Sequence, residues 1–425
     1  MPEFQTTPGT RDILPPDAAR WRAFIENFAT VVERAGFEQI ILPMFEDLGV
    51  FLRLGDATDV VTKEMYDFVD KGGRHVALRP EQTAGACRAY VQHHPVPPWK
   101  VWYAGPNFRY EKAQHGRYRQ FDQVGVEVLG VDDPLLDVEV IALAHEFFRL
   151  LGLRDVTLHI NSLGDAGDRD RYVSALSEYF NSHSSELSEE SRATLARNPL
   201  RVLDSKRPNE QDLIREAPSI THFLSDDAAA HFAMVQQGLA LLGVDFVVND
   251  RLVRGLDYYR RTTFEFSSGA LDSAQTAVGG GGRYDGLVED LGGAPTPGIG
   301  FAIGLDRTLL ACDAEAVFSA PSSAADVFVV DTTDGRAALT VSARLREAGQ
   351  RVERAYGAKS MKSQMKAADR SGAVFAVIVG SDEAAAGTCT VRNLSTSEQL
   401  TVPRDGLVAH LAGQLGSRTP RRSNS

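Results

Sequence analysis

From residue 326 onward the sequence alternates between short apolar runs and amphipathic segments, a pattern that strongly limits the possible folds. ADVFVVD, RVERAY and AVFAVIVG are typical of strands, and residues 336–348 and 360–371 between them are typical of helices. TCTVRN and EQLTV add two short strands before a final helix. Strands separated by helices in this way indicate an α/β unit with a mostly hydrophobic sheet.

The preceding part of the chain mixes longer helices with strands. Apolar residues at helical spacing predict the helices, and short apolar runs that stop at proline or glycine predict the strands. We therefore expect a mixed core that is interrupted once. The expected elements are a helix over 18–35, a strand over 38–42 ending at Pro43, strands across 75–130, a helix over 135–151, a strand over 158–161, and strands, glycine turns and one helix over 232–310.

Two stretches do not continue the core pattern. Residues 165–231 are helical and polar with few strand signals, which indicates an insertion. Residues 313–325 are small and contain Ser and Pro, which indicates a linker. The predicted boundaries are a split core over 1–164 and 232–312, a helical insertion domain over 165–231, a linker over 313–325, an α/β domain over 326–415 and a disordered tail over 416–425.

The composition argues against several classes of protein. With 43% hydrophobic and 24% charged residues the chain resembles an ordinary globular protein. Its three cysteines have no pairing pattern, so we expect no disulfide framework, no zinc knuckle and a cytoplasmic location. The first residues lack the apolar segment of a signal peptide, and no apolar run approaches the roughly 18 residues of a membrane span. A net charge of −12 would confine nucleic-acid contacts to local basic faces.

Five sequence segments carry the functional information. They are LRPEQTAG at 78–85, GPNFRYEKAQHGRYRQFDQVGVEVLG at 105–130, LVRGLDYYRRTTFEF at 252–266, GGGGRYDGLVEDLGG at 279–293 and GIGFAIGLDR at 298–307. In this order they resemble the bacterial histidyl-tRNA synthetases of class II, and the resemblance covers nearly the whole chain. LVRGLDYY and GGRYDGLV are the segments specific to that family.

The resemblance implies a fold and a reaction. The implied fold is α+β: a class II catalytic core on an antiparallel sheet, a helical insertion and a C-terminal α/β anticodon-binding domain. The implied histidine–tRNA ligase forms histidyl-adenylate and pyrophosphate from L-histidine and ATP, with Mg²⁺ accompanying ATP, and transfers histidine to the 3′ end of its tRNA. Residues 18–43 resemble the class II motif that builds a homodimer interface, although a plain core helix and strand would look the same.

Adenylation needs fixed cations because negative charge grows on the phosphoryl oxygens. A guanidinium group grips phosphate with two bonds, whereas an arginine taken alone is usually a solvated surface charge. By resemblance, Arg109 binds the α-phosphate and the amino-acid carboxylate, and Arg254 is a second catalytic cation at the α-phosphate. The other residues implied for ATP are Glu111 at the adenine end, Phe121 stacked on adenine, Arg307 on the opposite face and Arg117 at the γ-phosphate.

Histidine must be distinguished from other amino acids by its ring. Neutral imidazole offers one donor and one acceptor, so a carboxylate and a phenol on either side would match it. The resemblance assigns these roles to Glu127 and Tyr259. A buried polar pair rejects apolar isosteres because they leave it unpaired. The other expected histidine contacts are Glu81, Thr83 and Gln123 at the α-ammonium group, Tyr258 and Tyr284 as pocket walls, Gln82 at the pocket edge, and Arg109 and Arg254.

A basic stripe is expected in the C-terminal domain. Lys362, Lys366 and Arg370 recur every four residues and so share one helix face. Such a stripe can contact phosphates, although a solvated face would have the same composition. The family resemblance favours tRNA. Gln114 resembles the family residue that contacts the acceptor end of tRNA.

Several local features leave alternatives open. Gln82 stands where the family usually has Gly, and Lys112 where Arg is usual, which bears on details of substrate contact. Residues 279–282 indicate a close approach of backbone to substrate, with a mobile loop as the alternative. His93 and His94 have no nearby ligands, so we expect surface residues and no metal site.

Two other functions compete with a histidine–tRNA ligase. The first is a non-catalytic regulatory paralogue of ATP phosphoribosyltransferase, a class of protein that typically lacks the C-terminal domain. The second is another class II ligase, for threonine, proline or glycine, which would lack VRGLDYY and GGRYDGLV.

Overall fold

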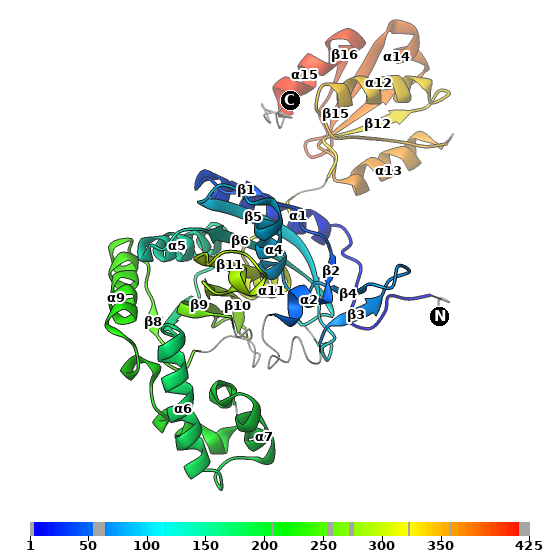
Figure 1. The fold of residues 1–425 in the computed structure, drawn as a ribbon. Helices are drawn as coiled ribbons and strands as arrows, with labels where there is room; N and C mark the ends of the chain where they lie inside the picture. Colours follow the sequence, from blue (N-terminus) through cyan, green and yellow to red (C-terminus); the bar gives the residue numbers. More distant parts are fainter. Residues whose placement is uncertain are drawn as a thin grey trace. The chain divides into compact units, whose positions relative to one another are not determined.

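The computed structural model describes residues 4–53, 64–114, 116–205, 207–252, 258–271, 276–321, 324–357 and 359–415. The chain divides into two compact units, residues 1–321 and 322–425, and Figure 1 labels many of their elements. Within these ranges, no helix combines the length and the apolar character that a membrane crossing requires.

An eight-stranded sheet forms the centre of the first unit, counted over the described residues. Its order is β1-β5-β6-β11-β10-β9-β7-β8, with parallel pairs only at the two edges. The five inner pairs are antiparallel, which confirms the antiparallel core. The strands are β1 (Glu38–Gln39), β5 (Trp99–Phe108), β6 (Gln120–Leu129), β7 (Val156–Ser162), β8 (Val247–Val248), β9 (Arg260–Ser268), β10 (Ala277–Arg283) and β11 (Gly298–Gly304).

One face of this sheet packs against helices to form the main apolar core. Successive residues of a strand point to opposite faces, so Val124, Val126 and Val128 of β6 enter this core. Gln123 and Glu127, at the alternate positions, face the other side, where the site described below lies. The helices of the core face are α1 (Asp17–Arg34), α5 (Pro134–Leu150), α9 (Asp226–Leu241) and α11 (Leu305–Ala314).

Smaller elements cover the opposite side. Helix α4 was not predicted from the sequence; it interrupts the strand-rich stretch and has buried small residues such as Ala84, Ala86 and Ala89. The strand expected over 38–42 is wrong in extent, because β1 ends at Gln39. The elements on this side are α4 (Thr83–His93), α10 (Leu287–Asp290), α2 (Leu48–Leu52) and a three-stranded sheet of β2 (Phe45–Asp47), β4 (His75–Leu78) and β3 (Tyr66–Val69).

A helical group between β7 and α9 has its own apolar cluster, which includes Tyr172, Leu176 and Phe180. Helix α9 begins inside the range expected for the insertion, yet it packs against α5, where Gly238 meets Val138. The group, green in Figure 1, contains α6 (Ala166–Ser182), α7 (Glu189–Arg197), η1 (Pro199–Asp204), η2 (Pro208–Glu210), α8 (Gln211–Glu216) and η3 (Ile220–His222).

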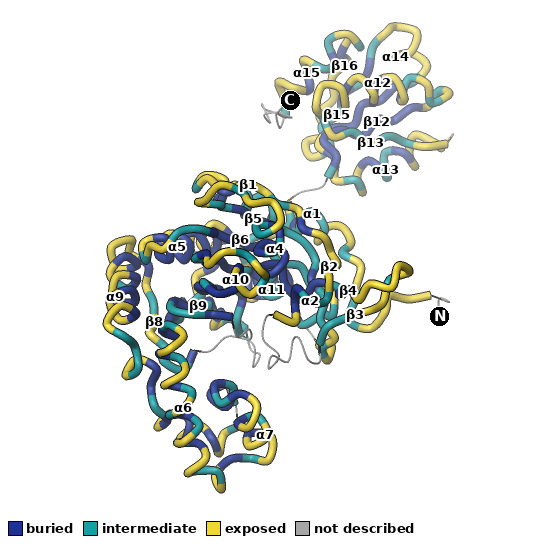
Figure 2. The backbone as a smooth tube through the Cα atoms, in the orientation of Figure 1, coloured by how far each residue is buried: buried dark blue, intermediate teal, exposed yellow. Residues whose placement is uncertain are grey.

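The second unit is the α/β domain expected from the alternating pattern. Its sheet has the order β13-β12-β14-β15-β16; β12 pairs in parallel with β13 and β14, and the last two strands are antiparallel. Strand β12 is buried along its length (Figure 2). The elements are β12 (Val327–Asp331), α12 (Arg336–Glu347), β13 (Val352–Arg354), α13 (Met361–Ser371), β14 (Phe375–Val379), α14 (Ser381–Ala386), β15 (Thr388–Asn393), β16 (Gln399–Pro403), η4 (Arg404–Gly406) and α15 (Leu407–Leu415).

Candidate active site

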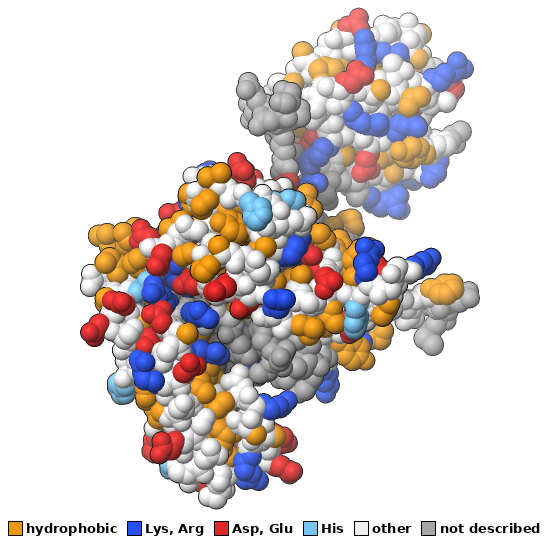
Figure 3. Space-filling view, viewed as in Figure 1, with side chains coloured by type: hydrophobic (Ala, Val, Ile, Leu, Met, Phe, Trp, Pro, Cys, Tyr) orange, Lys and Arg blue, Asp and Glu red, His pale blue; other side chains and the backbone are white. Residues whose placement is uncertain are grey.

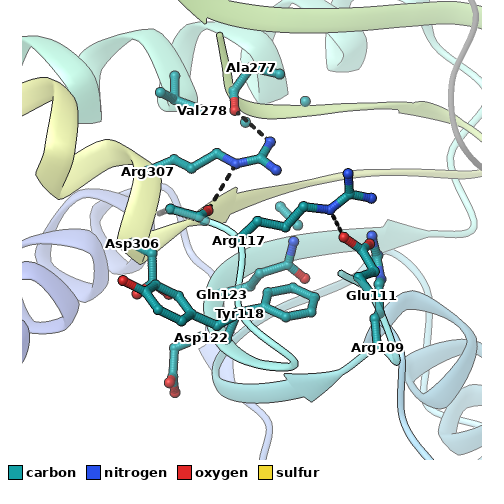
Figure 4. A pocket seen from close by; sticks show the side chains of 16 residues that line it. Arg109, Glu111, Arg117, Tyr118, Asp122, Gln123, Ala277, Val278, Asp306 and Arg307 are labelled. Carbon is teal, nitrogen blue, oxygen red and sulfur yellow. Dashed lines mark hydrogen bonds and ion pairs between the residues drawn. The ribbon is translucent and has the colours of Figure 1, made fainter. Parts of the chain in front are cut away.

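A hollow of about 200 Å³ opens between β6, β10, β11 and the loop that joins β5 to β6 (Figure 4). Antiparallel pairing of these strands brings segments from distant parts of the chain to one place. Its side chains are mainly charged and aromatic: Arg109, Glu111, Arg117, Tyr118, Phe121, Asp122, Gln123, Asp306 and Arg307.

Three arginines line this hollow, which is the larger of two adjoining hollows: Arg109, Arg117 and Arg307. Arg307, at the start of α11, donates to the carbonyl oxygens of Gly116 and Ala277, both at 3.3 Å. Burial is the main cause that lowers the pKa of Arg307, and the charges of Arg117 and Arg109 lower it further. Because the fold holds mutually repelling cations together, the hollow is suited to a polyanion.

The protein already holds two of these arginines in place. Arg117 forms an ion pair with Glu111, drawn as a dashed line in Figure 4. Arg109 donates from Nε to the carbonyl oxygen of Pro80 at 3.0 Å, and its guanidinium carbon lies 5.2 Å from the centre of the Phe121 ring. These contacts fix the Arg109 side chain between β6 and the segment that precedes α4.

A smaller hollow of about 80 Å³ adjoins the larger one. Arg109, Gln123, Gly280 and Ala302 line both hollows, so a ligand in one lies next to a ligand in the other. The further residues that line the smaller hollow are Glu81, Gln82, Thr83, Tyr103, Tyr258, Tyr259, Tyr284, Gly300 and Phe301.

Glu127 is buried beside this smaller hollow and accepts hydrogen bonds from three hydroxyl groups. Thr83 and Tyr103 donate to its Oε1 at 2.7 and 3.0 Å, and Tyr284 donates to its Oε2. Burial raises the pKa of Glu127 to about 8, although the three hydroxyls lower it, and the charge of Glu81 raises it further. Near neutral pH the carboxyl therefore carries a proton in the protein alone, and a ligand that stabilises the ionised form would release it.

Glycines make room for this buried carboxyl. A Cβ at position 125 would lie 2.5 Å from the Tyr103 hydroxyl, and one at position 300 would lie 1.9 Å from the Glu127 carboxylate. Any larger residue at Gly125 or Gly300 would push these groups apart. The two glycines on neighbouring strands thus allow Tyr103 to reach Glu127.

Other polar groups of the smaller hollow are held by local structure. Glu81 accepts the backbone N–H groups of Thr83 and Ala84 at 2.7 and 2.8 Å, so it caps the start of α4. Burial raises the pKa of Glu81. Burial also raises the pKa of Tyr258 and Tyr284 well above the usual value, so both phenols stay neutral donors.

Most of the expected site residues meet at the two hollows. The larger hollow brings together Arg109, Glu111, Arg117, Phe121 and Arg307, and the smaller one Glu81, Gln82, Thr83, Gln123, Tyr258, Tyr259 and Tyr284, with Glu127 next to it. Arg254 belongs to residues 253–257, which lie outside the described residues.

The glycine run forms most of strand β10. Gly279 and Gly280 line the larger hollow, where a close approach of their backbone to a ligand stays a prediction. At Gly281, in contrast, a Cβ would lie 2.0 Å from the carbonyl oxygen of Gly300 on β11, so there the neighbouring strand requires glycine.

The remaining expected residues lie away from the hollows. Gln114 is exposed in the loop between β5 and β6, and Lys362, Lys366 and Arg370 are exposed on α13 of the second unit. His93 and His94, at the end of α4, are exposed as well. Among the described residues, no three or more His, Cys, Asp or Glu side chains are grouped so that they could hold a metal ion.

Sequence reasoning missed four polar residues of the site. Tyr103 could have been found from strand alternation, because it lies on the same face of β5 as the hollow, opposite Trp102 in the core. Tyr118, Asp122 and Asp306 line the larger hollow, but no local pattern indicates that β6, its preceding loop and α11 meet.

Comparison with protein families gives two matches. Residues 9–308 match the family described as histidyl-tRNA synthetase, and residues 326–414 match the anticodon binding domain. The histidine–tRNA ligase of Rhodococcus erythropolis is 49% identical over 96% of this chain and 97% of its own length. That of Mycobacterium marinum is 48% identical over 98% of this chain and 100% of its own length.

Solved structures agree with these matches. The apo histidyl-tRNA synthetase of S. aureus has a TM-score of 0.81 at 35% identity and covers 96% of this chain and 99% of its own. An ATP phosphoribosyltransferase regulatory subunit/histidyl-tRNA synthetase from Bacillus halodurans has a TM-score of 0.65 at 20% identity over 89% of this chain and 98% of its own, a likeness that concerns the fold alone.

Proposed function

This chain belongs to the histidyl-tRNA synthetase family and acts as a histidine–tRNA ligase, and we propose that its two adjoining hollows bind ATP and histidine for the first step of that reaction. The observation that carries the proposal is the shared border. Arg109 lines both hollows, so one guanidinium group can contact the amino-acid carboxylate and the α-phosphate that it attacks.

The larger hollow is proposed as the ATP site. Arg109 would grip the α-phosphate, and Arg117 would exchange its ion pair with Glu111 for the γ-phosphate. The adenine ring would lie between Phe121 and Arg307, while Glu111 contacts its edge. Three cations that repel one another in the protein alone gain most from a ligand with several negative charges.

The smaller hollow is proposed as the histidine site. Glu127 and Tyr259 would contact the two ring nitrogens, and the neutral phenols of Tyr258 and Tyr284 would form the walls. An apolar side chain of similar size would leave the Glu127 carboxyl without the ring contact. The α-ammonium group would be held by Glu81, Thr83 and Gln123, with Gln82 at the edge.

Arg254 is proposed as the second catalytic cation. It lies outside the described residues, so the proposal rests on the match of LVRGLDYY to the family. A cation that acts on the α-phosphate mainly in the transition state would raise the rate without tightening histidine binding.

Mg²⁺ is proposed to enter with ATP. Mg²⁺ keeps several waters and binds phosphate oxygens, so it needs no dedicated set of protein ligands. The described carboxylates at the hollow are compatible with this, because Glu111 and Asp306 are already paired with arginines. When bound, the ion would neutralise charge on the phosphates, while Arg109 and Arg117 position them.

The second unit is proposed to hold the anticodon region of tRNA through α13. Lys362, Lys366 and Arg370 are exposed, and Figure 3 shows Lys and Arg side chains over the visible face of this unit. Tyr356 lies nearby in the chain with 67% of its surface exposed, and the Arg354 guanidinium carbon is 4.5 Å from its ring centre. Exposed aromatic and cationic groups of this kind suit unpaired bases.

Gln114 is proposed to contact the acceptor end of tRNA. Its exposed loop follows Arg109 and precedes Arg117, so a contact there lies next to the proposed ATP site.

We also propose that two copies associate through the edge of the large sheet. β1 is an edge strand, and Ile41, Met44 and Phe45 beside it are 87, 51 and 56% exposed. An open strand edge flanked by exposed apolar side chains is a surface that a second copy would cover. The cysteines are buried and unpaired, which suits a reducing compartment such as the cytosol: Cys87, Cys312 and Cys389.

ATP–pyrophosphate exchange with each of the twenty amino acids in turn tests the two-hollow proposal. Exchange should require histidine, and activity with threonine, proline or glycine in its place would overturn it. The regulatory-paralogue alternative predicts no exchange; it is not favoured, because full-length relatives of 48–49% identity are histidine–tRNA ligases.

A further inference from the structure

Arg11, in the segment before α1, joins two elements of the larger hollow. Its Nη1 donates to the hydroxyl of Tyr118, and its guanidinium carbon lies 4.1 Å from the centre of that ring. Its Nη2 donates to Asp306 at 2.5 Å. Tyr118 and Asp306 both line the hollow, on the loop before β6 and at the start of α11 (Figure 4).

Backbone contacts fix the segment that carries Arg11. The carbonyl oxygen of Gly9 accepts the N–H groups of Arg119 and Gln120 at 2.8 and 3.3 Å. Gly9 has φ of +83°, and a Cβ there would lie 2.5 Å from the Arg119 side chain, so glycine is required for this approach. The segment is thereby tied to the loop before β6, and Arg11 cannot easily move away.

Asp306 would harm a polyanion site if it were uncompensated. Its side chain is 9% exposed, whereas that of Arg11 is 39% exposed. Burial raises the pKa of Asp306, and the charge of Arg11 lowers it. The neighbouring Asp122 has a pKa raised to about 6, first by burial and then by repulsion from Asp306. Near neutral pH, above its pKa of about 6, Asp122 is therefore largely ionised. The Asp306 carboxyl is held in an ion pair by the Arg11 guanidinium beside the hollow proposed for the triphosphate.

We propose that Arg11 is a positioning residue that compensates the Asp306 charge at the border of the nucleotide hollow and so sets the affinity for ATP. Without it, a buried carboxylate would face the phosphates and compete for the adjacent Arg307. Loss of Arg11 would leave histidine binding unaffected, because neither Arg11 nor its two partners line the smaller hollow. The inference rests on the proposed binding of ATP in the larger hollow.

Histidine-dependent ATP–pyrophosphate exchange by the full chain tests this inference through KM values. Arg11→Met keeps the length of the side chain and removes its charge, and should raise the KM for ATP about tenfold while the KM for histidine stays within about twofold. The double variant that combines Arg11→Met with Asp306→Asn should regain most of the lost ATP affinity, since Asp306→Asn removes the charge that Arg11 compensates. Arg11→Lys should retain most of the wild-type affinity.

Arg22→Ala is the matched control. Arg22 lies on α1 with 70% of its side chain exposed and pairs with Glu26 at 3.7 Å, so its loss should leave both KM values unchanged. An unchanged KM for ATP in Arg11→Met, an equal rise of both KM values, or a double variant as impaired as Arg11→Met would each overturn the role of Arg11. Absence of histidine-dependent exchange in the wild type would instead overturn the proposed sites themselves.

Discussion

Replacing Glu127 by glutamine should weaken histidine binding far more than ATP binding. The ionised carboxyl can accept a charge-assisted hydrogen bond from an imidazole N–H, and such a bond contributes about 1.5–3 kcal/mol. The amide keeps the shape of the side chain and loses the charge. The KM for histidine should therefore rise about 10- to 100-fold at a pH where the wild-type carboxyl is ionised.

The pKa of about 8 for Glu127 makes this loss depend on pH. Roughly a tenth of the wild-type molecules are ionised at pH 7 and half at pH 8, and apparent affinity scales with that fraction. Glutamine does not titrate in this range. The ratio of the variant's histidine KM to that of the wild type should therefore rise about fivefold from pH 7 to pH 8 and level off above pH 9. Titration of free histidine cancels in the ratio.

Exchange kinetics from pH 6.5 to pH 9.5 measure this ratio, with the KM for ATP as an internal control that should not change. Tyr284→Phe gives a second check. The Tyr284 hydroxyl lowers the pKa of Glu127, so its removal should move the inflection of the histidine KM to higher pH. A ratio that is flat over this pH range, or an equal loss of ATP affinity, would refute the reasoning.

Three further outcomes are expected. Arg254→Ala should slow adenylate formation by roughly two to three orders of magnitude with little change in histidine affinity, measured by single-turnover kinetics; a near-normal rate would remove its catalytic role. Lys362→Ala should weaken tRNA binding and reduce the salt slope by about one, whereas Arg336→Ala, whose side chain already pairs with Asp334, should not; equal slopes would favour a solvated face. Ile41→Asp should shift the chain toward monomers in analytical ultracentrifugation, and an unchanged mass would place the interface elsewhere.

Periodicity predicted the elements well where one face of a segment is buried. The helix expected over 18–35 is α1, Asp17–Arg34, because Phe24, Phe28 and Val31 face the core at helical spacing. The apolar run over 38–42 gave a wrong end for the predicted strand, for the opposite reason. Ile41 is 87% exposed, so its hydrophobicity does not report burial in this chain and the strand ends earlier.

Helix α4 was missed because small residues produce a weak amphipathic signal. Ala84, Ala86 and Ala89 are buried against neighbouring elements, yet alanine contributes little to any apolar pattern. The helix is fixed instead by its cap and its packing. The carboxylate of Glu81 accepts two backbone N–H groups at its start, an interaction between residues two and three positions apart that LRPEQT does not reveal without a structure.

The family resemblance predicted the site residues, but it did not predict their hydrogen bonds or their pKa values. Strand alternation alone places Gln123 and Glu127 on one face of β6. It does not predict that Tyr284, 157 positions away, donates to Glu127, or that burial raises the pKa of this carboxyl to about 8. These properties depend on which strands are neighbours, and the order β6-β11-β10 is a tertiary fact.

In an acidic protein that binds a triphosphate, the negative charge of the carboxyls beside the binding cations must be compensated. At the larger hollow Glu111 is paired with Arg117, and Asp306 with Arg11. Asp122 depends on more distant charges, since Arg79 and Arg11 both lower its pKa against the effects of burial and Asp306. Loss of Arg11 would therefore act on two carboxyls at once. Because Arg11 lies 107 positions from Tyr118 and 295 from Asp306, no local pattern could have indicated this role, and only the folded arrangement makes it a testable property of the ATP site.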